Sequence, residues 1–153
     1  MDDKIYDKQC VIEANIDDMN PEIYSYIEEK LFEAGALDVY KTPIIMKKGR
    51  PAIKLSILVN SEHEEDIEKI IFEETTSIGI RKFGVKKVML KRNFFKLNTK
   101  YGAVTIKNSY FNGKMVSCKP EFEDCRRIAH ENNIAIKEVY REVSKLMEEY
   151  NDK

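Results

Sequence analysis

Two adjacent acids, Asp17 and Asp18, lie between a short apolar run and the start of an expected helix in the segment NIDDMNPE. Aspartate and asparagine favour turns and caps because their side chains bond the nearby backbone, so a solvated turn is the simpler interpretation. A divalent-metal site is the sharper one, because Mg²⁺ is usually held by one or two carboxylates and leaves room for substrate phosphates. Taken alone, the segment favours the turn.

A basic turn lies further along the chain, in the segment MKKGRPAIK. Lysine and arginine donate charge-assisted hydrogen bonds to phosphate, and a glycine among them suits a tight turn. The Gly-x-x-x-x-Gly-Lys-Ser/Thr phosphate loop is absent, so an ordinary basic hairpin tip is the simpler interpretation. The candidate phosphate ligands in this segment are Lys47, Lys48, Arg50 and Lys54.

Two further segments combine polar and charged side chains. In ETTSIGIRK, two threonine hydroxyls and an arginine could hold phosphate or sugar, although threonine more often completes a helix end. In PEFEDCRR, acids and arginines fall in the first turns of an expected helix, where the helix dipole favours acids anyway. No pair of nucleophile and base is visible, so no catalytic residue is predicted. The residues concerned are Thr75, Thr76, Arg81, Glu121, Glu123, Asp124, Arg126 and Arg127.

Composition indicates a folded domain with no general affinity for polyanions. Of 153 residues, 42% are hydrophobic and 35% charged, which is typical of a globular protein, and the net charge of −1 provides no basic field for nucleic acid. The acidic segment MDDKIYDKQC is no signal peptide, and we expect no transmembrane helix. Three widely spaced cysteines predict neither a disulfide framework nor a cysteine zinc site, and favour the cytoplasm.

Apolar periodicity predicts a ferredoxin-like lobe over residues 9–92. The order of the patterns is β-α-β-β-α-β, in which two helices cover one face of a four-stranded antiparallel sheet and leave the other face open. Asn20 and a Ser61–Glu64 capping box are the expected helix starts. The strand patterns cover 10–16, 37–45, 51–60 and 80–91, and the helical stripes cover 21–34 and 61 to about 74.

Residues 93–153 predict a second lobe. Strand patterns flank the turn KYG, and the Asn-Gly pair in FNGK is a hairpin signal. Pro120 opens one helix, and a last helix carries an apolar stripe from Ile136 to Met147. The predicted fold class is therefore α+β, a ferredoxin-like βαββαβ lobe followed by a small antiparallel β-meander with two C-terminal helices. Since no flexible linker separates the lobes, we expect them to pack as one unit.

Five segments, in this order, carry a family resemblance: NIDDMNPE, LFEAGALDV, PIIMKKGRP, FEETTSIGIR and PEFEDCRRIA…IKEVYRE. From about Val11 to Glu142 the chain resembles the C-terminal domain of the nickel insertase of nickel-pincer nucleotide biosynthesis, the LarC family. The resemblance implies a lyase-class nickel chelatase that inserts nickel into pyridinium-3,5-bisthiocarboxylic acid mononucleotide, using CTP and Mg²⁺ or Mn²⁺. It also implies that this domain binds CTP and forms a homo-oligomer, a trimer or hexamer.

Carried over by position, the resemblance places the divalent metal on Asp17 and Asp18. Glu123 and Asp124 match a family segment, and the resemblance leaves open whether they bind ligand or a neighbouring subunit. The family's N-terminal domain, which handles nickel with a histidine-rich segment, has no counterpart in this chain, so we expect a part of a longer protein or one product of a split gene. Asn133 is expected to take the left-handed position of a family glycine. The implied nucleotide ligands are Lys47, Lys48, Arg50 and Lys54, then Thr75, Thr76 and Arg81, with Arg126 and Arg127 as further candidates.

Two other functions stay open. A non-catalytic ferredoxin-like module that binds a small ligand or assembles an oligomer fits the same fold, and Val11 on the open face could be covered by a partner chain. An RNA-recognition module needs stacking aromatic residues on that face. The first strand instead offers Glu13, Asn15 and Asp17, whose acids would repel phosphate, so nucleic acid is not an expected partner.

Overall fold

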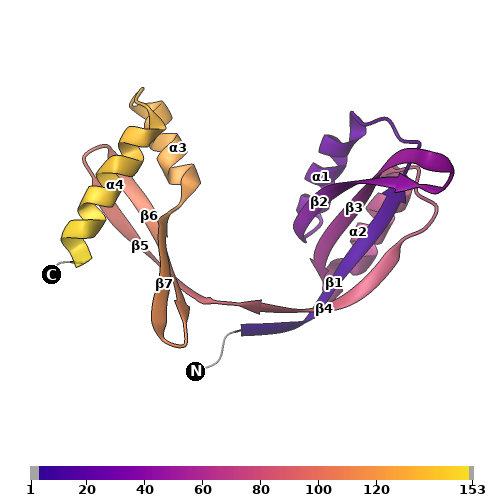
Figure 1. Ribbon diagram of the computed structural model, residues 1–153, viewed down its shortest axis with the longest axis horizontal. Helices are drawn as coiled ribbons and strands as arrows, with labels where there is room; N and C mark the ends of the chain where they lie inside the picture. The colour runs from indigo at the N-terminus through magenta and orange to yellow at the C-terminus, as the bar shows by residue number, and fades with distance from the viewer. Residues whose placement is uncertain (1–3, 152–153) are drawn as a thin grey trace. The chain divides into compact units, whose positions relative to one another are not determined.

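The structure is a computed structural model that describes residues 4–151 and contains two compact units (Figure 1). The first unit spans Ile5–Lys87, and the chain from Val88 onward belongs to the second. That the two units pack as one stays a prediction. Within the described residues, no helix is both long and apolar enough to cross a membrane.

The first unit has the predicted ferredoxin-like topology. Its strands lie in the order β2-β3-β1-β4, with β3 antiparallel to both of its neighbours. Short 3₁₀ turns at Lys47–Gly49 and Ser61–His63 precede β3 and α2. The elements are β1 (Lys4–Ile16), α1 (Ile23–Glu33), β2 (Ala36–Met46), β3 (Arg50–Asn60), α2 (Glu64–Glu74) and β4 (Arg81–Met89).

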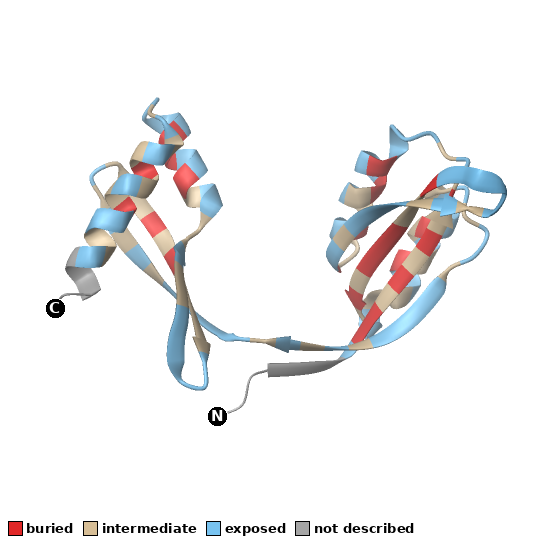
Figure 2. Cartoon of the chain, viewed as in Figure 1, coloured by how far each residue is buried: buried red, intermediate tan, exposed pale blue. Residues whose placement is uncertain are grey.

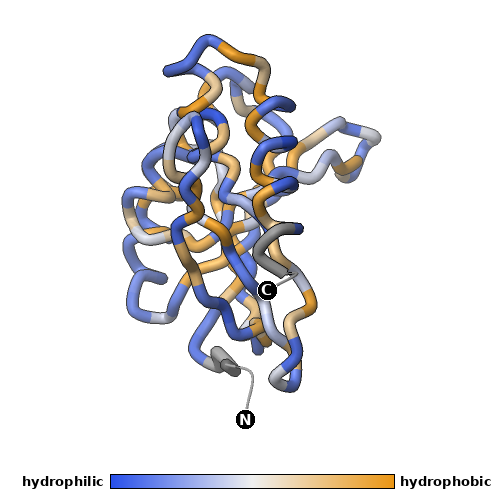
Figure 3. Tube along the Cα trace, turned by 90° about the vertical axis from the view of Figure 1, so that its left-hand side faces the viewer, coloured by the Kyte–Doolittle hydropathy of each residue, from blue (hydrophilic) through white to orange (hydrophobic). Residues whose placement is uncertain are grey.

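The core of the first unit lies between the sheet and its two helices (Figure 2). Ile12 of β1 lies opposite Ile57 of β3, and both are fully buried together with Ile27 of α1 and Ile67 of α2. Because successive side chains of a strand point to opposite faces, the residues between these positions lie on the face away from the helices. Figure 3 shows this alternation of hydropathy along the chain.

Gly35 follows the end of α1 and has the left-handed conformation that favours glycine there. Gly35 has φ +96°, in the left-handed region, and a Cβ placed there would lie 2.8 Å from Cδ2 of His63. Asn20 Oδ1 accepts the Glu22 N–H at 3.1 Å, although α1 itself begins at Ile23.

The predicted capping box at the start of α2 is wrong. Ser61 Oγ donates to the Lys8 carbonyl at 3.2 Å, and α2 begins at Glu64 without a side-chain cap. The Ser61 hydroxyl therefore ties this turn to β1, a contact between residues far apart in the sequence.

The second unit is the predicted β-meander with two helices. Its sheet has the order β5-β6-β7, and Val104 and Ile106 of β6 pack with Cys125 and Val139 of the helices. Asn133, between the helices, has φ +50°, which confirms its predicted left-handed conformation. The elements are β5 (Lys91–Thr99), β6 (Gly102–Phe111), β7 (Lys114–Pro120), α3 (Phe122–Glu131) and α4 (Ile136–Asn151).

Candidate functional site

A pocket of about 510 Å³ opens in the first unit where the end of β1, the β2–β3 hairpin and the α2–β4 loop meet. We refer to it as the polar pocket. Three segments that are far apart in the sequence bring both predicted metal ligands and four predicted phosphate ligands to its lining. These six residues are Asp17, Asp18, Lys47, Arg50, Thr76 and Arg81.

Asp17 and Arg50 form an ion pair within the polar pocket. Arg50 Nη1 lies 3.2 Å from Asp17 Oδ2, and the Asp17 side chain is 17% exposed against 56% for Arg50. The pair joins the end of β1 to the start of β3. Among the described residues, the other oxygen, Asp17 Oδ1, has no hydrogen-bond or ion-pair partner. A predicted metal ligand and a predicted phosphate ligand are therefore in direct contact.

Two further contacts hold the α2–β4 loop and the start of β4 against β1. Thr76 donates its hydroxyl proton to Asp18 Oδ1 in a short hydrogen bond of 2.5 Å. With the Asn15 amide oriented to satisfy its neighbours, its oxygen accepts from Arg81 Nη2 and Nη1 at 3.0 and 3.2 Å. These contacts hold Arg81 and Thr76 at the pocket wall.

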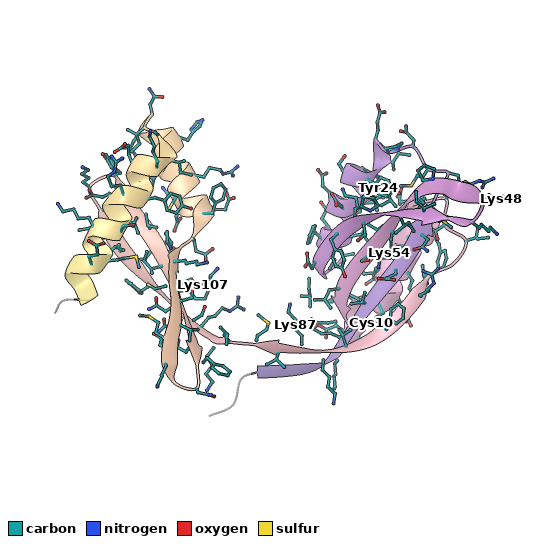
Figure 4. All side chains as sticks on the ribbon, viewed as in Figure 1. Cys10, Tyr24, Lys48, Lys54, Lys87 and Lys107 are labelled. Atoms are coloured by element: carbon teal, nitrogen blue, oxygen red, sulfur yellow. The ribbon has the colours of Figure 1, made fainter. Side chains whose placement is uncertain are left out.

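The adjacent residues Lys47 and Lys48 have different positions. Lys47 lines the polar pocket, whereas Lys48 takes a left-handed conformation with φ +63° at the hairpin end and is not part of the lining. Figure 4 shows Lys48 at that end and Lys54 further along β3. Lys54 Nζ forms an ion pair with Glu13 Oε1 at 3.0 Å, so in this structure the lysine binds a carboxylate of the neighbouring strand.

Thr75 also lies outside the pocket lining. Its hydroxyl donates to the Ile71 carbonyl at 2.6 Å and accepts the Ser77 N–H at 3.0 Å. These are the bonds of a residue that ends a helix, because the last carbonyls of a helix lack partners within it. Thr75 therefore completes the end of α2 in the structure, the simpler of its two predicted roles. A contact between Thr75 and the nucleotide stays a prediction.

The polar pocket fits a hard cation that also binds phosphate. Asp17 and Asp18 each use one carboxylate oxygen in the bonds described above, which leaves the other oxygen of each for a metal. Oxygen ligands suit Mg²⁺ or Mn²⁺. Over the part of the chain that the structure describes, no group of three or more His, Cys, Asp or Glu side chains could hold a metal by itself. The donor set therefore fits an ion that takes the rest of its ligands from a nucleotide and water.

The predicted residues on α3 lie in the second unit and make contacts there. Asp124 Oδ2 accepts the Thr105 N–H of β6 at 2.7 Å. Hydrogen bonds from the Thr105 hydroxyl and N–H lower the pKa of Asp124 to about 2, with a further bond from Arg127. Arg127 also pairs with Glu131 at 3.0 Å, and Arg126 pairs with Glu123 at 2.7 Å. The bond of Asp124 to Thr105, and a bond from Arg127 Nη2 to the Ala103 carbonyl at 3.3 Å, hold α3 on β6.

Sequence reasoning missed a second pocket of the first unit, of about 590 Å³, which we refer to as the apolar pocket. It lies between the start of α1 and the β2–β3 hairpin, and Asp17 lines it as well as the polar pocket. The only hint of this pocket in the sequence was its three prolines. They lie on separate segments, and nothing in the local sequence predicts that these segments come together. Its other principal wall residues are Pro21, Tyr24, Pro43, Ile45 and Pro51.

Comparison with known proteins identifies the family. Residues 1–140 match the family model described as nickel insertion protein. The chain belongs to the nickel insertion protein family.

Named relatives and solved structures agree with membership of the nickel insertion family. The chain is 57% identical over 139 residues to the pyridinium-3,5-bisthiocarboxylic acid mononucleotide nickel insertion protein of Clostridium acetobutylicum, which is 91% of this chain and 33% of that protein. It is 44% identical to the protein of the same name from Thermotoga petrophila over 143 residues, 94% of this chain and 36% of the relative. The chain thus spans about a third of the length of the curated relatives that it matches.

A solved structure resembles this nickel insertion family member over nearly its whole length. It is described as LarC2, the C-terminal domain of a cyclometallase involved in the synthesis of the NPN cofactor of lactate racemase, in its apo form. The TM-score is 0.84 at 36% sequence identity, covering 92% of this chain and 96% of the other. The predicted resemblance to the C-terminal domain of the LarC family is confirmed.

Proposed function

We propose that this chain is the nucleotide-binding part of an enzyme that inserts nickel into pyridinium-3,5-bisthiocarboxylic acid mononucleotide, and that its polar pocket binds CTP with Mg²⁺ or Mn²⁺. The observation that carries the proposal is the meeting of two carboxylates and three cations in one pocket. The names of the relatives support nickel insertion as the reaction. We assign the enzyme to the lyase class and propose that it acts in the cytoplasm. The five residues are Asp17, Asp18, Lys47, Arg50 and Arg81.

Each group in the polar pocket has a task in this proposal. Lys47, Arg50 and Arg81 would bind the triphosphate, since arginine and lysine donate several charge-assisted bonds to phosphate oxygens. Asp17 and Asp18 would hold the divalent ion, which supplies charge stabilisation at the phosphates when bound. The chain's own contribution is to fix these groups before the nucleotide arrives, which lowers the entropic cost of binding. Activation of the pyridinium mononucleotide by CTP would then take place at the α-phosphate.

Nickel, the substrate metal, and the pyridinium mononucleotide need further partners. We assign nickel handling to an N-terminal nickel-handling domain of the kind that the family resemblance implies. The support is that the curated relatives are about three times as long as the matched segment. Transfer of nickel would then bring that domain to the nucleotide-binding unit.

The open face of the sheet supports a homo-oligomer, which we propose to be a trimer or hexamer. Phe83 is 48% exposed, Tyr40 45% exposed and Val11 partly exposed, on the face of the sheet away from the helices. The same surface favours the second candidate function, a non-catalytic ligand-binding or oligomerisation module. Sedimentation of the parent and of Phe83→Glu tests the oligomer, with a monomeric parent as the contradicting result.

Calorimetric titration of the chain with CTP, ATP, GTP and UTP tests the proposed function. Each nucleotide is added with Mg²⁺, with Mn²⁺ and with EDTA. We expect binding that requires the metal and favours CTP, together with a matching rise in the thermal midpoint, because a ligand that binds the folded state stabilises it. Failure of every nucleotide to bind would contradict the proposal, and would leave the oligomerisation module as the better account.

A further inference from the structure

Charge is divided unevenly along the chain. The segment 88–120, which includes the strands β5, β6 and β7, contains seven lysine and arginine residues and no aspartate or glutamate. The net charge of −1 for the whole chain conceals this cationic segment, because most of the acids lie in the first unit. Such a segregation of charge favours an anionic partner for the second unit.

Alternate residues of the three strands form one face of this sheet, turned away from α3 and α4. Ile106 of β6 is buried under the helices, so Lys107, which follows it, lies on the opposite face. Residues paired across neighbouring strands share a face, so Phe94 of β5 and Lys119 of β7 lie beside Lys107. We refer to this surface as the cationic face. Its principal residues are Arg92, Phe94, Lys96, Lys107, Phe111 and Lys119.

Two phenylalanine side chains are exposed on the cationic face. Phe94 is 56% exposed and Phe111 50% exposed, whereas Phe95, the neighbour of Phe94, packs against the core of the second unit. An open sheet face with aromatic residues on which bases can stack is what an RNA-recognition module needs. The first strand of the first unit offers acids at such positions, but the sheet of the second unit offers phenylalanines among cations.

The cations of this face are available to a ligand. Among the residues that the structure describes, Arg92 and Lys119 have no ion-pair partner. Lys96 Nζ lies 3.6 Å from Asp124 Oδ2, with the lysine side chain 63% exposed, and Lys107 Nζ lies 2.8 Å from Glu121 Oε1, with the lysine side chain 35% exposed. Ion pairs that water reaches in this way are weak, so a phosphate can replace either carboxylate at low cost.

The combination of lysine and phenylalanine separates nucleic acid from other anionic partners. Protein interfaces are depleted in lysine, and small ligands occupy concave sites, whereas the cationic face is the open side of three neighbouring strands. Proteins that bind single-stranded nucleic acid without sequence preference combine a cationic surface with aromatic rings on which bases stack.

We propose that the cationic face binds single-stranded nucleic acid without sequence preference. The phosphates contact Arg92, Lys107 and Lys119, and the bases stack on Phe94 and Phe111. This binding goes beyond the proposed function and does not depend on it, because it uses side chains of the second unit and the proposed CTP site lies in the first.

Phe94→Ala tests the stacking, with Phe122→Ala as its matched control. Phe122 is 54% exposed and lies on α3, outside the sheet, so both variants should keep the thermal midpoint of the parent. Binding of labelled oligothymidylate and oligouridylate is measured by fluorescence anisotropy in EDTA, which removes the metal that the polar pocket needs. We expect the parent to bind both with a Kd of about 1–100 μM at physiological salt. Phe94→Ala should weaken both about fivefold to 100-fold, the scale of one stacked base, and Phe122→Ala less than about twofold.

The double variant Arg92→Gln/Lys119→Gln tests the phosphate contacts. Each cation that contacts a phosphate contributes about 0.7 to the slope of log affinity against log salt concentration, so the double variant should lower that slope by about 1.4. The control is Lys137→Gln/Lys145→Gln, which removes the same charge from exposed positions of α4 in the same unit. Its slope should equal that of the parent.

Four results would overturn the inference. The first is no binding of either oligonucleotide to the parent at physiological salt. The second is inorganic polyphosphate that competes as well as an oligonucleotide with the same number of phosphates, together with no effect of Phe94→Ala, since the face would then attract any anion. The third is polyglutamate that binds more tightly than an oligonucleotide of equal charge, which would assign the face to an acidic protein. The fourth is an equal loss in both double variants. CTP binding in Mg²⁺ tests the proposed function separately and is unaffected by any of these results.

Discussion

Arg50 Nη1 lies 3.2 Å from Asp17 Oδ2, so a candidate phosphate ligand and a candidate metal ligand are paired before any nucleotide is present. The Arg50 side chain is 56% exposed although that of Asp17 is only 17% exposed, so water screens the pair from the arginine side and its contribution is about 1 kcal/mol. Exchanging this pair for contacts with a metal and a phosphate therefore costs little. Before a nucleotide binds, the ion pair keeps the side chains of Asp17 and Arg50 in the polar pocket.

Asp17→Asn is expected to weaken binding of CTP with Mg²⁺ about 10- to 100-fold, because a charged metal contact of about 1.5–3 kcal/mol is lost. In EDTA the variant is expected to bind CTP no more weakly than the parent, since a carboxylate that repels phosphate has been removed. Calorimetry under both conditions measures the difference. Asp38→Asn, at an exposed position of β2 outside both pockets, is the control. Equal affinity of Asp17→Asn and parent for CTP with Mg²⁺ would remove Asp17 from the metal site.

Lys47 and Lys48 are expected to differ in nucleotide binding although they are adjacent. Lys47→Gln is predicted to weaken CTP binding about threefold to tenfold, because Lys47 lines the polar pocket and the variant loses its positive charge. Lys48→Gln is predicted to change affinity less than about twofold, at the scale of a screened surface charge. Both variants keep a long side chain at the same backbone position, so each serves as control for the other. A larger loss in Lys48→Gln would contradict the side-chain positions described above.

Part of the site could be predicted from the sequence because it depends on local order. The carboxylates Asp17 and Asp18 follow directly on a strand, and the basic turn follows from a lysine–glycine hairpin signal. The alternation of Ile12 and Ile57 on their strands predicts the buried face. The left-handed position of Asn133 was implied by the family resemblance, in which a glycine stands at this turn.

The rest depends on contacts that the local sequence does not determine. Thr76 bonds Asp18 across 58 residues, and its neighbour Thr75 instead ends α2, a difference that two adjacent threonines do not reveal. Lys47 and Lys48 differ only in the backbone angle that the turn gives them. The Ser61 hydroxyl donates to the Lys8 carbonyl of β1 and α2 has no side-chain cap, because tertiary partners compete with local caps.

Asp124→Asn is expected to destabilise the second unit at pH 7 by about 1–3 kcal/mol, because the Thr105 N–H loses a charged acceptor. The pKa of Asp124 is lowered from 3.8 to about 2 in the folded chain, so its stabilising effect is complete above pH 3.8 and is lost as the pH falls toward 2. Urea unfolding of parent and variant between pH 7 and pH 2 measures this. The difference in free energy of unfolding should shrink over that interval.

Glu123→Gln is the control for Asp124, because Glu123 is 70% exposed and pairs only with Arg126 in the described contacts. Its stability should stay within about 0.5 kcal/mol of the parent. A difference between Asp124→Asn and parent that persists unchanged down to pH 2 would mean that the carboxylate charge is not what holds α3 on β6.

Gly35→Ala is expected to destabilise the first unit by about 1–3 kcal/mol. Its φ of +96° disfavours any Cβ, and an added Cβ would approach the His63 ring to 2.8 Å. Gly84→Ala, on β4 with open space around the added carbon, is expected to be neutral or slightly stabilising. Thermal unfolding of the two variants gives the comparison, and equal midpoints would refute the requirement for glycine at the end of α1.

The most direct measurement of the central claim is a crystal structure of the chain with Mn²⁺ and CTP, with manganese located by its anomalous scattering. The account predicts a manganese peak bonded to a carboxylate oxygen of Asp17 or Asp18, with the triphosphate against Lys47, Arg50 and Arg81. A nucleotide bound at Arg126 and Arg127 of α3, or manganese bonded to neither aspartate, would contradict it.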